Sequence, residues 1–111
     1  MIPVTDELLR QLTEQIVEAV NPRQVILFGS HARGDARSDS DLDLLVVEDQ
    51  PFGPSRSRRA EMVKLWRLLR EIPVAKDFLV YSQGEIDELR NDRNHVLYRA
   101  LREGRVLYDK H

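Results

Sequence analysis

The sequence predicts an α/β (α+β) protein in which helices pack on a small β-sheet. Three observations support this prediction. Apolar residues recur at helical spacing near the N-terminus, two short runs of β-forming residues follow close together, and a third run comes after a second helical pattern. The chain has 111 residues, enough for one hydrophobic core. We therefore expect residues 1–111 to form a single domain.

The first helix is predicted to begin after Thr5, an N-cap residue followed by two acidic residues. Apolar residues recur at helical spacing as far as Val20, and Asn21-Pro22 ends the helix. The run QVILF, residues 24–28, is predicted to be the first strand, and Gly29 stops it. We expect the apolar stripe of the helix to pack on the sheet.

A glycine–serine pair and two aspartates then flank a ten-residue connection. Gly29 can adopt backbone angles that are closed to other residues, and Ser30 offers a hydroxyl at the start of a short helix that runs through Arg33. Asp41 and Asp43 are predicted to lie on a second strand, at the start of an apolar run. Residues i and i+2 of a strand point to the same face, so these two side chains should project together from one side of it. Two carboxylates so close together repel each other unless a cation lies between them, and Mg²⁺ or Mn²⁺ suits such oxygen ligands.

Other interpretations of this segment stay open when the residues are considered singly. A Gly-Ser pair is common in plain strand-to-loop turns, and Arg33 fits a solvated loop as well as a phosphate contact. The segment is not a P-loop, because no Gly-Lys-Ser/Thr follows, and it has no GxGxxG fingerprint. Only the spacing between the Gly-Ser pair and the two aspartates makes the pattern specific.

The middle of the chain predicts a loop and a helix. Residues 48–57 contain two prolines and a glycine, which predicts a mobile loop. Residues 58–71 are predicted to form a helix with an apolar stripe and with cations on its other faces, which fits a solvated face or a docking surface for an acidic partner or RNA. The stripe consists of Met62, Leu65, Trp66 and Leu69, and the cations are Arg58, Arg59, Lys64, Arg67 and Arg70.

The run VAKDFLVY, residues 74–81, is predicted to be a third strand, and Asp77 is its only acidic residue. A carboxylate within such a run is unfavourable without a partner, so Asp77 either has a partner or faces water on an edge strand. Ser82 and Glu85 form a capping box that opens a helix, which we expect to break near Asn91 and to end at Gly104. A last strand is expected at residues 106–108.

Composition excludes several classes of protein. Charged residues make up 32% of the chain and the net charge is −2, which gives no argument for a polyanionic partner. Cysteine is absent, which excludes disulfides and thiolate zinc sites. Charged residues throughout the first helix exclude a signal peptide or membrane span there, so a cytoplasmic location is expected. The three histidines are far apart and form no ligand pair, and His95 is expected to be structural: His31, His95 and His111.

Gly29-Ser30, ten residues, then Asp41-x-Asp43 resembles the signature of the DNA polymerase β nucleotidyltransferase superfamily. The longer string GSHARGDARSDSDLDLLV resembles its small prokaryotic branch, the minimal nucleotidyltransferase (MNT) domains, many of which are antitoxins of HEPN-type ribonuclease toxins. The resemblance spans nearly the whole chain. It implies a polymerase-β-like nucleotidyltransferase fold with a small mixed β-sheet.

The resemblance also implies roles for individual residues. The family places a third carboxylate on the strand beside the Asp-x-Asp strand, which here is Asp77. Asp41, Asp43 and Asp77 would be the catalytic residues and the ligands of two Mg²⁺ or Mn²⁺ ions. ATP would be the substrate, with its phosphates on Gly29 and Ser30 and with Arg33 as a further candidate contact. The family does not use Asp39 as a ligand, and we assign that residue to the loop.

The length of the chain leaves little room for a second domain that would hold an acceptor. The resemblance implies transfer of AMP from ATP to a tyrosine of a cognate HEPN toxin, so that the protein acts as an antitoxin. The predicted loop at 48–57 and the basic helix after it are candidate docking surfaces. Two alternatives stay open: a non-catalytic antitoxin that neutralises the toxin by binding, and an adenylyltransferase that acts on a small molecule.

Overall fold

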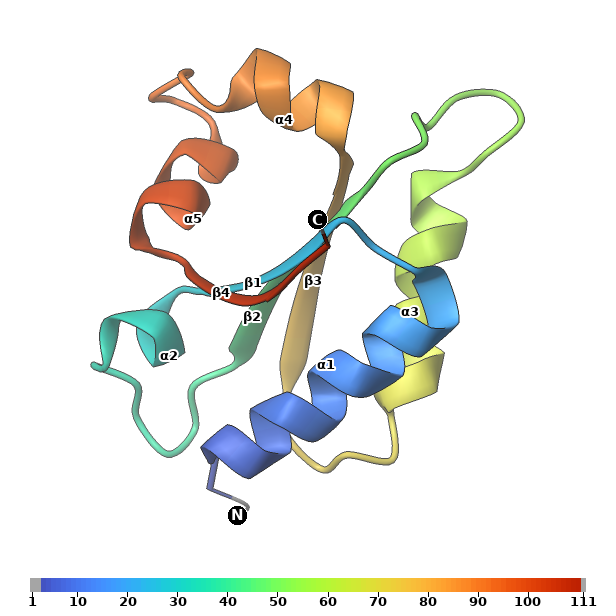
Figure 1. Cartoon of the computed structure of the whole chain (residues 1–111). Helices are drawn as coiled ribbons and strands as arrows, with labels where there is room; N and C mark the ends of the chain where they lie inside the picture. The colour runs from blue at the N-terminus through green and yellow to red at the C-terminus, as the bar shows by residue number, and fades with distance from the viewer. Residues whose placement is uncertain (1–2, 111) are drawn as a thin grey trace.

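The strands form one mixed sheet in the order β3-β2-β1-β4 (Figure 1). The computed structural model describes residues 3–110. The strands are β1 Gln24–Phe28, β2 Leu42–Glu48, β3 Lys76–Ser82 and β4 Arg105–Asp109. β1 runs antiparallel to β2 and to β4, whereas β2 and β3 are parallel. The predicted α/β fold with a small mixed sheet is confirmed, and so is the last strand.

Helices cover both faces of this sheet (Figure 1). The helices are α1 Asp6–Val20, α2 Ser30–Arg33, α3 Arg58–Leu69, α4 Gln83–Leu89 and α5 Val96–Glu103. Successive side chains of β2 point to opposite faces of the sheet and so belong to two different cores. Leu44 and Val46 pack with α1 and α3, whereas Leu45 and Val47 pack with α4 and α5. Asp43 shares the parity of Leu45, so its side chain points to the face of α4 and α5.

Local signals in the sequence set the ends of several helices. The Thr5 side chain accepts a hydrogen bond from the amide of Leu8 at the start of α1. Ser82 and Glu85 form both halves of the predicted capping box at the start of α4. The predicted break separates α4 from α5, where the His95 ring accepts from the amide of Leu97 as an N-cap, in agreement with a structural role. Within the described residues, no helix is both long and apolar enough to cross a membrane.

The predicted apolar stripe on α3 is wrong at one position. Leu65 and Leu69 are fully buried and Met62 packs against the core, but Trp66 is 57% exposed. The physical reason is that α3 packs along β3, an edge strand of the sheet. A side chain that projects past that edge has no further strand to cover it.

The segment at residues 48–57 differs from the expected mobile loop. Glu48 is the last residue of β2. Arg56 holds the loop that follows in place through hydrogen bonds. The Arg56 guanidinium donates to the carbonyl of Gln50 and to the carboxylates of Glu48 and Glu61, and it lies 4.3 Å from the centre of the Phe52 ring. The other boundary differences are small: α3 ends at Leu69, and β3 begins at Lys76.

Candidate active site

Asp43 and Asp77 meet at the ends of two neighbouring strands. They are direct partners in the parallel pairing of β2 and β3, and partners in a sheet point to the same face. Phe28 is the partner of Asp43 on the other side, so Gly29, the next residue, lies beside Asp43. Asp41 falls one residue before β2 rather than within it. The structure therefore brings the predicted residues of β1, β2 and β3 to one edge of one face.

Gly29 lies against the carboxylate of Asp43. Its φ is +73° and its ψ is −156°, a combination that side chains with a Cβ rarely adopt. A Cβ placed on Gly29 would lie 2.2 Å from Oδ2 of Asp43. Glycine is thus required here both by the backbone conformation and by the position of the carboxylate.

The charges of the two other aspartates act on Asp43. Burial raises the pKa of the Asp43 carboxyl above its ordinary value, and the charges of Asp77 and Asp41 raise it further. Within residues 3–110, no cationic side chain lies within 4.0 Å of any of these three carboxylates. Mutual repulsion without a protein cation is the condition under which a divalent ion is favoured.

The donor chemistry at this edge fits Mg²⁺ or Mn²⁺. All the candidate ligands are carboxylate oxygens, which these hard ions prefer over nitrogen or sulfur. In residues 3–110, no three acidic, histidine or cysteine side chains already converge on one point as a finished ligand set. Asp41 precedes the strand and Asp77 is exposed on an edge strand, so these two side chains are the ones free to turn toward an ion.

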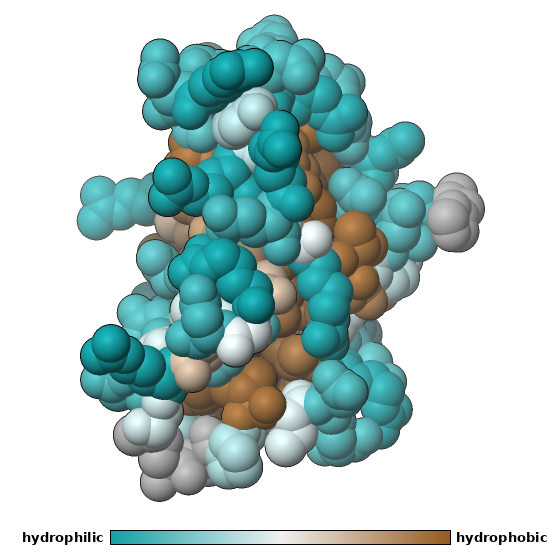
Figure 2. All heavy atoms as spheres, turned by 90° about the vertical axis from the view of Figure 1, so that its left-hand side faces the viewer, coloured by the Kyte–Doolittle hydropathy of each residue, from teal (hydrophilic) through white to brown (hydrophobic). Residues whose placement is uncertain are grey.

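The helices on this face are short. α4 and α5 contain 7 and 8 residues, against 15 and 12 for α1 and α3 on the other face. Seen from the side of α2 and α5, polar side chains cover most of the surface and apolar ones show between them (Figure 2). Asp43 is accordingly only partly buried and Asp77 is exposed, which leaves both open to a ligand.

α2 places Ser30 and Arg33 at its two ends, as predicted. Ser30 is the first helical residue after Gly29, and the first amides of a helix have no acceptor within it. Arg33 forms ion pairs with Glu103 and Asp35, and these partners raise the pKa of its guanidinium, with Glu103 the larger cause. Its role as a phosphate contact stays a prediction, because it already has two carboxylate partners.

His31 lies at the site, although the sequence pattern predicts no role for it. Its Nε2 lies 3.2 Å from the carbonyl oxygen of Ser40, and a carbonyl can only accept, so the ring donates this bond. The contact fixes the loop immediately before Asp41. The charge of His31 also opposes the upward pKa shift of Asp43. Its position directly after Ser30 was the only signal in the sequence.

Glu48 forms a second acidic cluster at the opposite end of β2. It is only 4% exposed, and its Oε2 has no hydrogen-bond partner in the described structure. Arg56 bridges Glu48 and Glu61. Burial and then Glu61 raise the pKa of the Glu48 carboxyl from 4.5 to about 7, against the opposing effect of Arg56. The sequence did not predict that Glu48 is buried. Glu48 comes at the start of the segment expected to be a loop, where a glutamate would normally face water.

We expect Glu48→Gln to flatten the pH dependence of stability. The folded state holds the Glu48 proton more tightly than the unfolded state, so this group's contribution to the free energy of unfolding is lost as pH rises from 4.5 to about 7. The contribution is on the order of 1–3 kcal/mol. Urea unfolding of both proteins across this range measures it, with Glu88→Gln as the exposed control. Parallel curves for Glu48→Gln and wild type would contradict the assignment.

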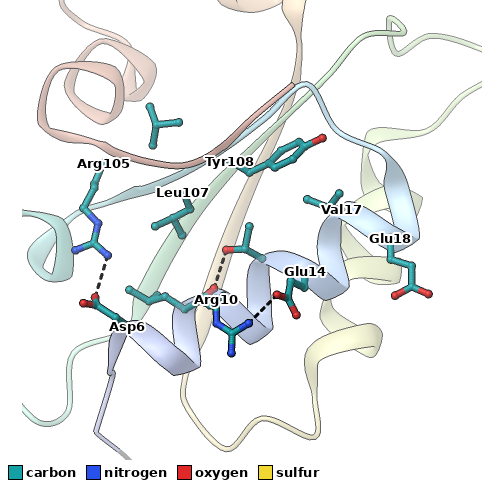
Figure 3. Close-up of a pocket in the computed structure, with 11 residues that line it drawn as sticks. Asp6, Arg10, Glu14, Val17, Glu18, Arg105, Leu107 and Tyr108 are labelled. Atoms are coloured by element: carbon teal, nitrogen blue, oxygen red, sulfur yellow. Dashed lines mark hydrogen bonds and ion pairs between the residues drawn. The ribbon is translucent and has the colours of Figure 1, made fainter. Parts of the chain in front are cut away.

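A groove of about 550 Å³ lies between α1 and β4, away from the aspartates (Figure 3). Val17 and Tyr108 line it, and the ion pair between Arg105 and Asp6 crosses one end. It opens on the face of α1, whereas Asp43 points to the face of α4 and α5. The groove is therefore separate from the candidate active site.

The family of nucleotidyltransferase domains matches this chain over residues 9–93. A protein of Methanocaldococcus jannaschii named "Putative protein adenylyltransferase" is 38% identical over 89 residues, which cover 78% of this chain and 78% of that protein. A second protein of that organism, with the same type of name, is 33% identical over 58 residues, covering 52% of this chain and 58% of its own.

Two solved structures share the fold. A crystal structure of a Sulfolobus solfataricus protein assigned as a nucleotidyltransferase has a TM-score of 0.55 at 24% identity, covering 92% of this chain and 81% of that one. A crystal structure of a toxin-antitoxin with AMP-PNP has a TM-score of 0.61 at 16% identity, covering 91% of this chain and 73% of that one.

Proposed function

This chain belongs to the nucleotidyltransferase domain family, and from that premise we propose that it transfers AMP from ATP to a tyrosine of a cognate HEPN-type toxin. The observation that carries the proposal is the pairing of Asp43 with Asp77 beside Gly29. This arrangement places unpaired carboxylates next to a backbone segment that a phosphate can approach closely. The resulting modification would silence the toxin, so the protein would act as its antitoxin.

Asp41, Asp43 and Asp77 would hold two Mg²⁺ or Mn²⁺ ions in the proposed site. When bound, these ions neutralise the phosphate charge and lower the pKa of the attacking hydroxyl. The hydroxyl of Ser30 and the first amides of α2 bind the β- and γ-phosphates of ATP, and Gly29 lets them approach because it has no side chain. The chain's own residues thus orient the α-phosphate toward the exposed edge at Asp77.

The proposed reaction is an in-line displacement at the α-phosphorus. The tyrosine oxygen forms a bond to the α-phosphorus, the bond from phosphorus to the bridging oxygen breaks, and pyrophosphate leaves. Asp77 is exposed on the edge strand, where it can accept the tyrosine proton. The products are AMP-tyrosine and pyrophosphate, with the proton passing on to solvent.

Two lines of comparison support a protein acceptor. The curated relatives are named as protein adenylyltransferases, and one structural neighbour is a toxin-antitoxin with AMP-PNP. A non-catalytic antitoxin that only binds its toxin is the main alternative, and the presence of all three candidate carboxylates favours catalysis over it. Transfer to a small molecule is the other alternative.

Intact-mass spectrometry of the toxin tests the proposal. After incubation with this protein, ATP and Mg²⁺, we expect the toxin mass to rise by one or more AMP groups, and EDTA to abolish the increase. The double variant Asp41→Ala/Asp43→Ala is the matched inactive protein. A toxin that is neutralised without any mass change, and equally well by the double variant, would leave the binding antitoxin as the function.

A further inference from the structure

An apolar groove of about 300 Å³ lies beside Asp77, between α3 and the edge strand β3. We name it the α3–β3 groove. Its lining residues are Arg59, Met62, Val63, Trp66, Lys76, Asp77 and Phe78. Trp66 is 57% exposed and Val63 is 40% exposed, so two large apolar side chains face water next to a candidate catalytic residue.

The helical repeat explains why these side chains form one stripe. Arg59, Met62, Val63 and Trp66 follow the spacing i, i+3, i+4 and i+7 on α3, which places them on one side of the helix. α3 packs along β3, and β3 is the last strand on that side of the sheet (Figure 1). Met62 packs against the core, but no element of the described structure covers Val63 and Trp66, and exposed apolar side chains that lie together mark interaction sites.

The rim of the groove is basic although the chain has a net charge of −2. Among the described residues, no carboxylate lies within 4.0 Å of the Arg59 guanidinium. The Lys76 ammonium donates to the carbonyl oxygens of Ile72 and Val74, which do not neutralise it. Charge complementarity therefore favours an occupant that surrounds an apolar side chain with carboxylates.

The groove meets the candidate active site at the edge strand β3, although α3 packs on the opposite face of the sheet from the one to which Asp43 points. Asp77 lines the groove, and the same residue is the strand partner of Asp43. A protein seated in the groove would hold its neighbouring side chains at the edge where AMP is to be transferred. Positioning of the attacking oxygen is the part of the reaction that this edge lacks, because productive attack requires the oxygen about 3–3.5 Å from phosphorus.

We propose that the α3–β3 groove is the docking surface for the acceptor protein, which places an apolar side chain against Trp66 and carboxylates around Arg59 and Lys76. This inference rests on the proposed function for the identity of the acceptor protein. It assigns Trp66 and Arg59 to recognition of the protein substrate and not to the chemical step. Of the basic helix α3, only the side that carries Arg59, Val63 and Trp66 would contact the acceptor protein.

Titration of the HEPN-type toxin into this protein, without ATP, tests the groove directly. We expect Trp66→Ser to raise Kd at least tenfold, since exposed tryptophans at interfaces are frequent binding hot spots, and Arg59→Glu to raise it several-fold. Val96→Ser and Arg93→Glu are the matched controls, because Val96 is 49% exposed on α5 and Arg93 is exposed before it. In AMP transfer, KM for the toxin should rise with Kd, and kcat should stay within twofold.

Four outcomes separate the possibilities. Unchanged Kd in Trp66→Ser overturns the groove proposal even if AMP is transferred normally. Binding that depends on Trp66 without any AMP transfer supports the groove and overturns the proposed function. No binding of the toxin by the wild-type protein overturns the groove proposal. If the wild-type protein is a dimer and Trp66→Ser is a monomer that still binds the toxin, the groove is occupied by a second copy of this chain. That outcome would overturn the groove proposal.

Discussion

Asp43→Asn should abolish AMP transfer while leaving the protein folded. The carboxylate of Asp43 lies against Gly29 and is affected by the charge of Asp77. Its loss therefore removes the central candidate ligand. A metal ion contributes several kcal/mol to charge stabilisation in such reactions, which corresponds to a loss in kcat on the order of 10²–10³-fold. Intact-mass spectrometry of the toxin over a time course measures the loss.

The same variant should be at least as stable as wild type without metal. Burial and the charges of Asp77 and Asp41 raise the pKa of Asp43, so ionisation of this group destabilises the folded state as pH rises through that pKa. Asparagine removes the charge, and we expect an unchanged or higher melting temperature at neutral pH in EDTA.

Companion variants show which carboxylates matter. Asp77→Asn should lose transfer to a similar extent, whereas Asp39→Asn, in the exposed loop, should keep it. Full transfer by Asp77→Asn would place the third carboxylate elsewhere. A lower melting temperature for Asp43→Asn in EDTA would show that the charge of Asp43 stabilises the metal-free fold. That result would contradict the role of Asp43 as a repelled carboxylate that binds a cation.

Gly29→Ala should lose both stability and transfer. The new Cβ would lie 2.2 Å from Oδ2 of Asp43 at a φ of +73°, so the carboxylate must move and the backbone is strained. We expect a cost of about 1–3 kcal/mol in the free energy of unfolding. We also expect AMP transfer to fall on the order of 10²-fold, because the new methyl group displaces the Asp43 carboxylate from the position in which it would bind the metal ion.

Gly34→Ala is the matched control for the strain. Gly34 also has a positive φ, of +84°, but nothing lies within 4 Å of the position of its Cβ. It should lose about 1–2 kcal/mol of stability from the backbone conformation alone and keep its transfer activity. Equal losses of transfer in the two variants would attribute the effect of Gly29→Ala to stability and not to Asp43.

The pair of variants also locates the phosphate-binding turn. Gly29 ends β1 and precedes α2, and Gly34 ends α2. If only the first glycine is needed for transfer, the functional turn is the one that contacts β2. Metal dependence adds a further check, since ATP binding measured by calorimetry should require Mg²⁺ or Mn²⁺ in wild type and should be weakened in Gly29→Ala.

The sequence alone determined the parts of the site that depend on local spacing. The apolar run after Asp43 predicts the strand that carries this residue, and the Gly29-Ser30 pair at the end of a strand predicts the turn that lies beside it. Thr5 and the Ser82–Glu85 capping box likewise predict where two helices begin. These features concern residues a few positions apart, whose geometry is set by the backbone repeat and by local hydrogen bonds.

Only the tertiary structure decided which distant residues meet. The register that pairs Asp43 with Asp77 comes from parallel pairing of β2 with β3, and the exposure of Trp66 comes from the position of β3 at the edge of the sheet. The burial of Glu48 depends on Arg56 and Glu61, which the loop and α3 bring to it. Pattern along the chain cannot predict these contacts, because strand order and register are set by how the whole core packs.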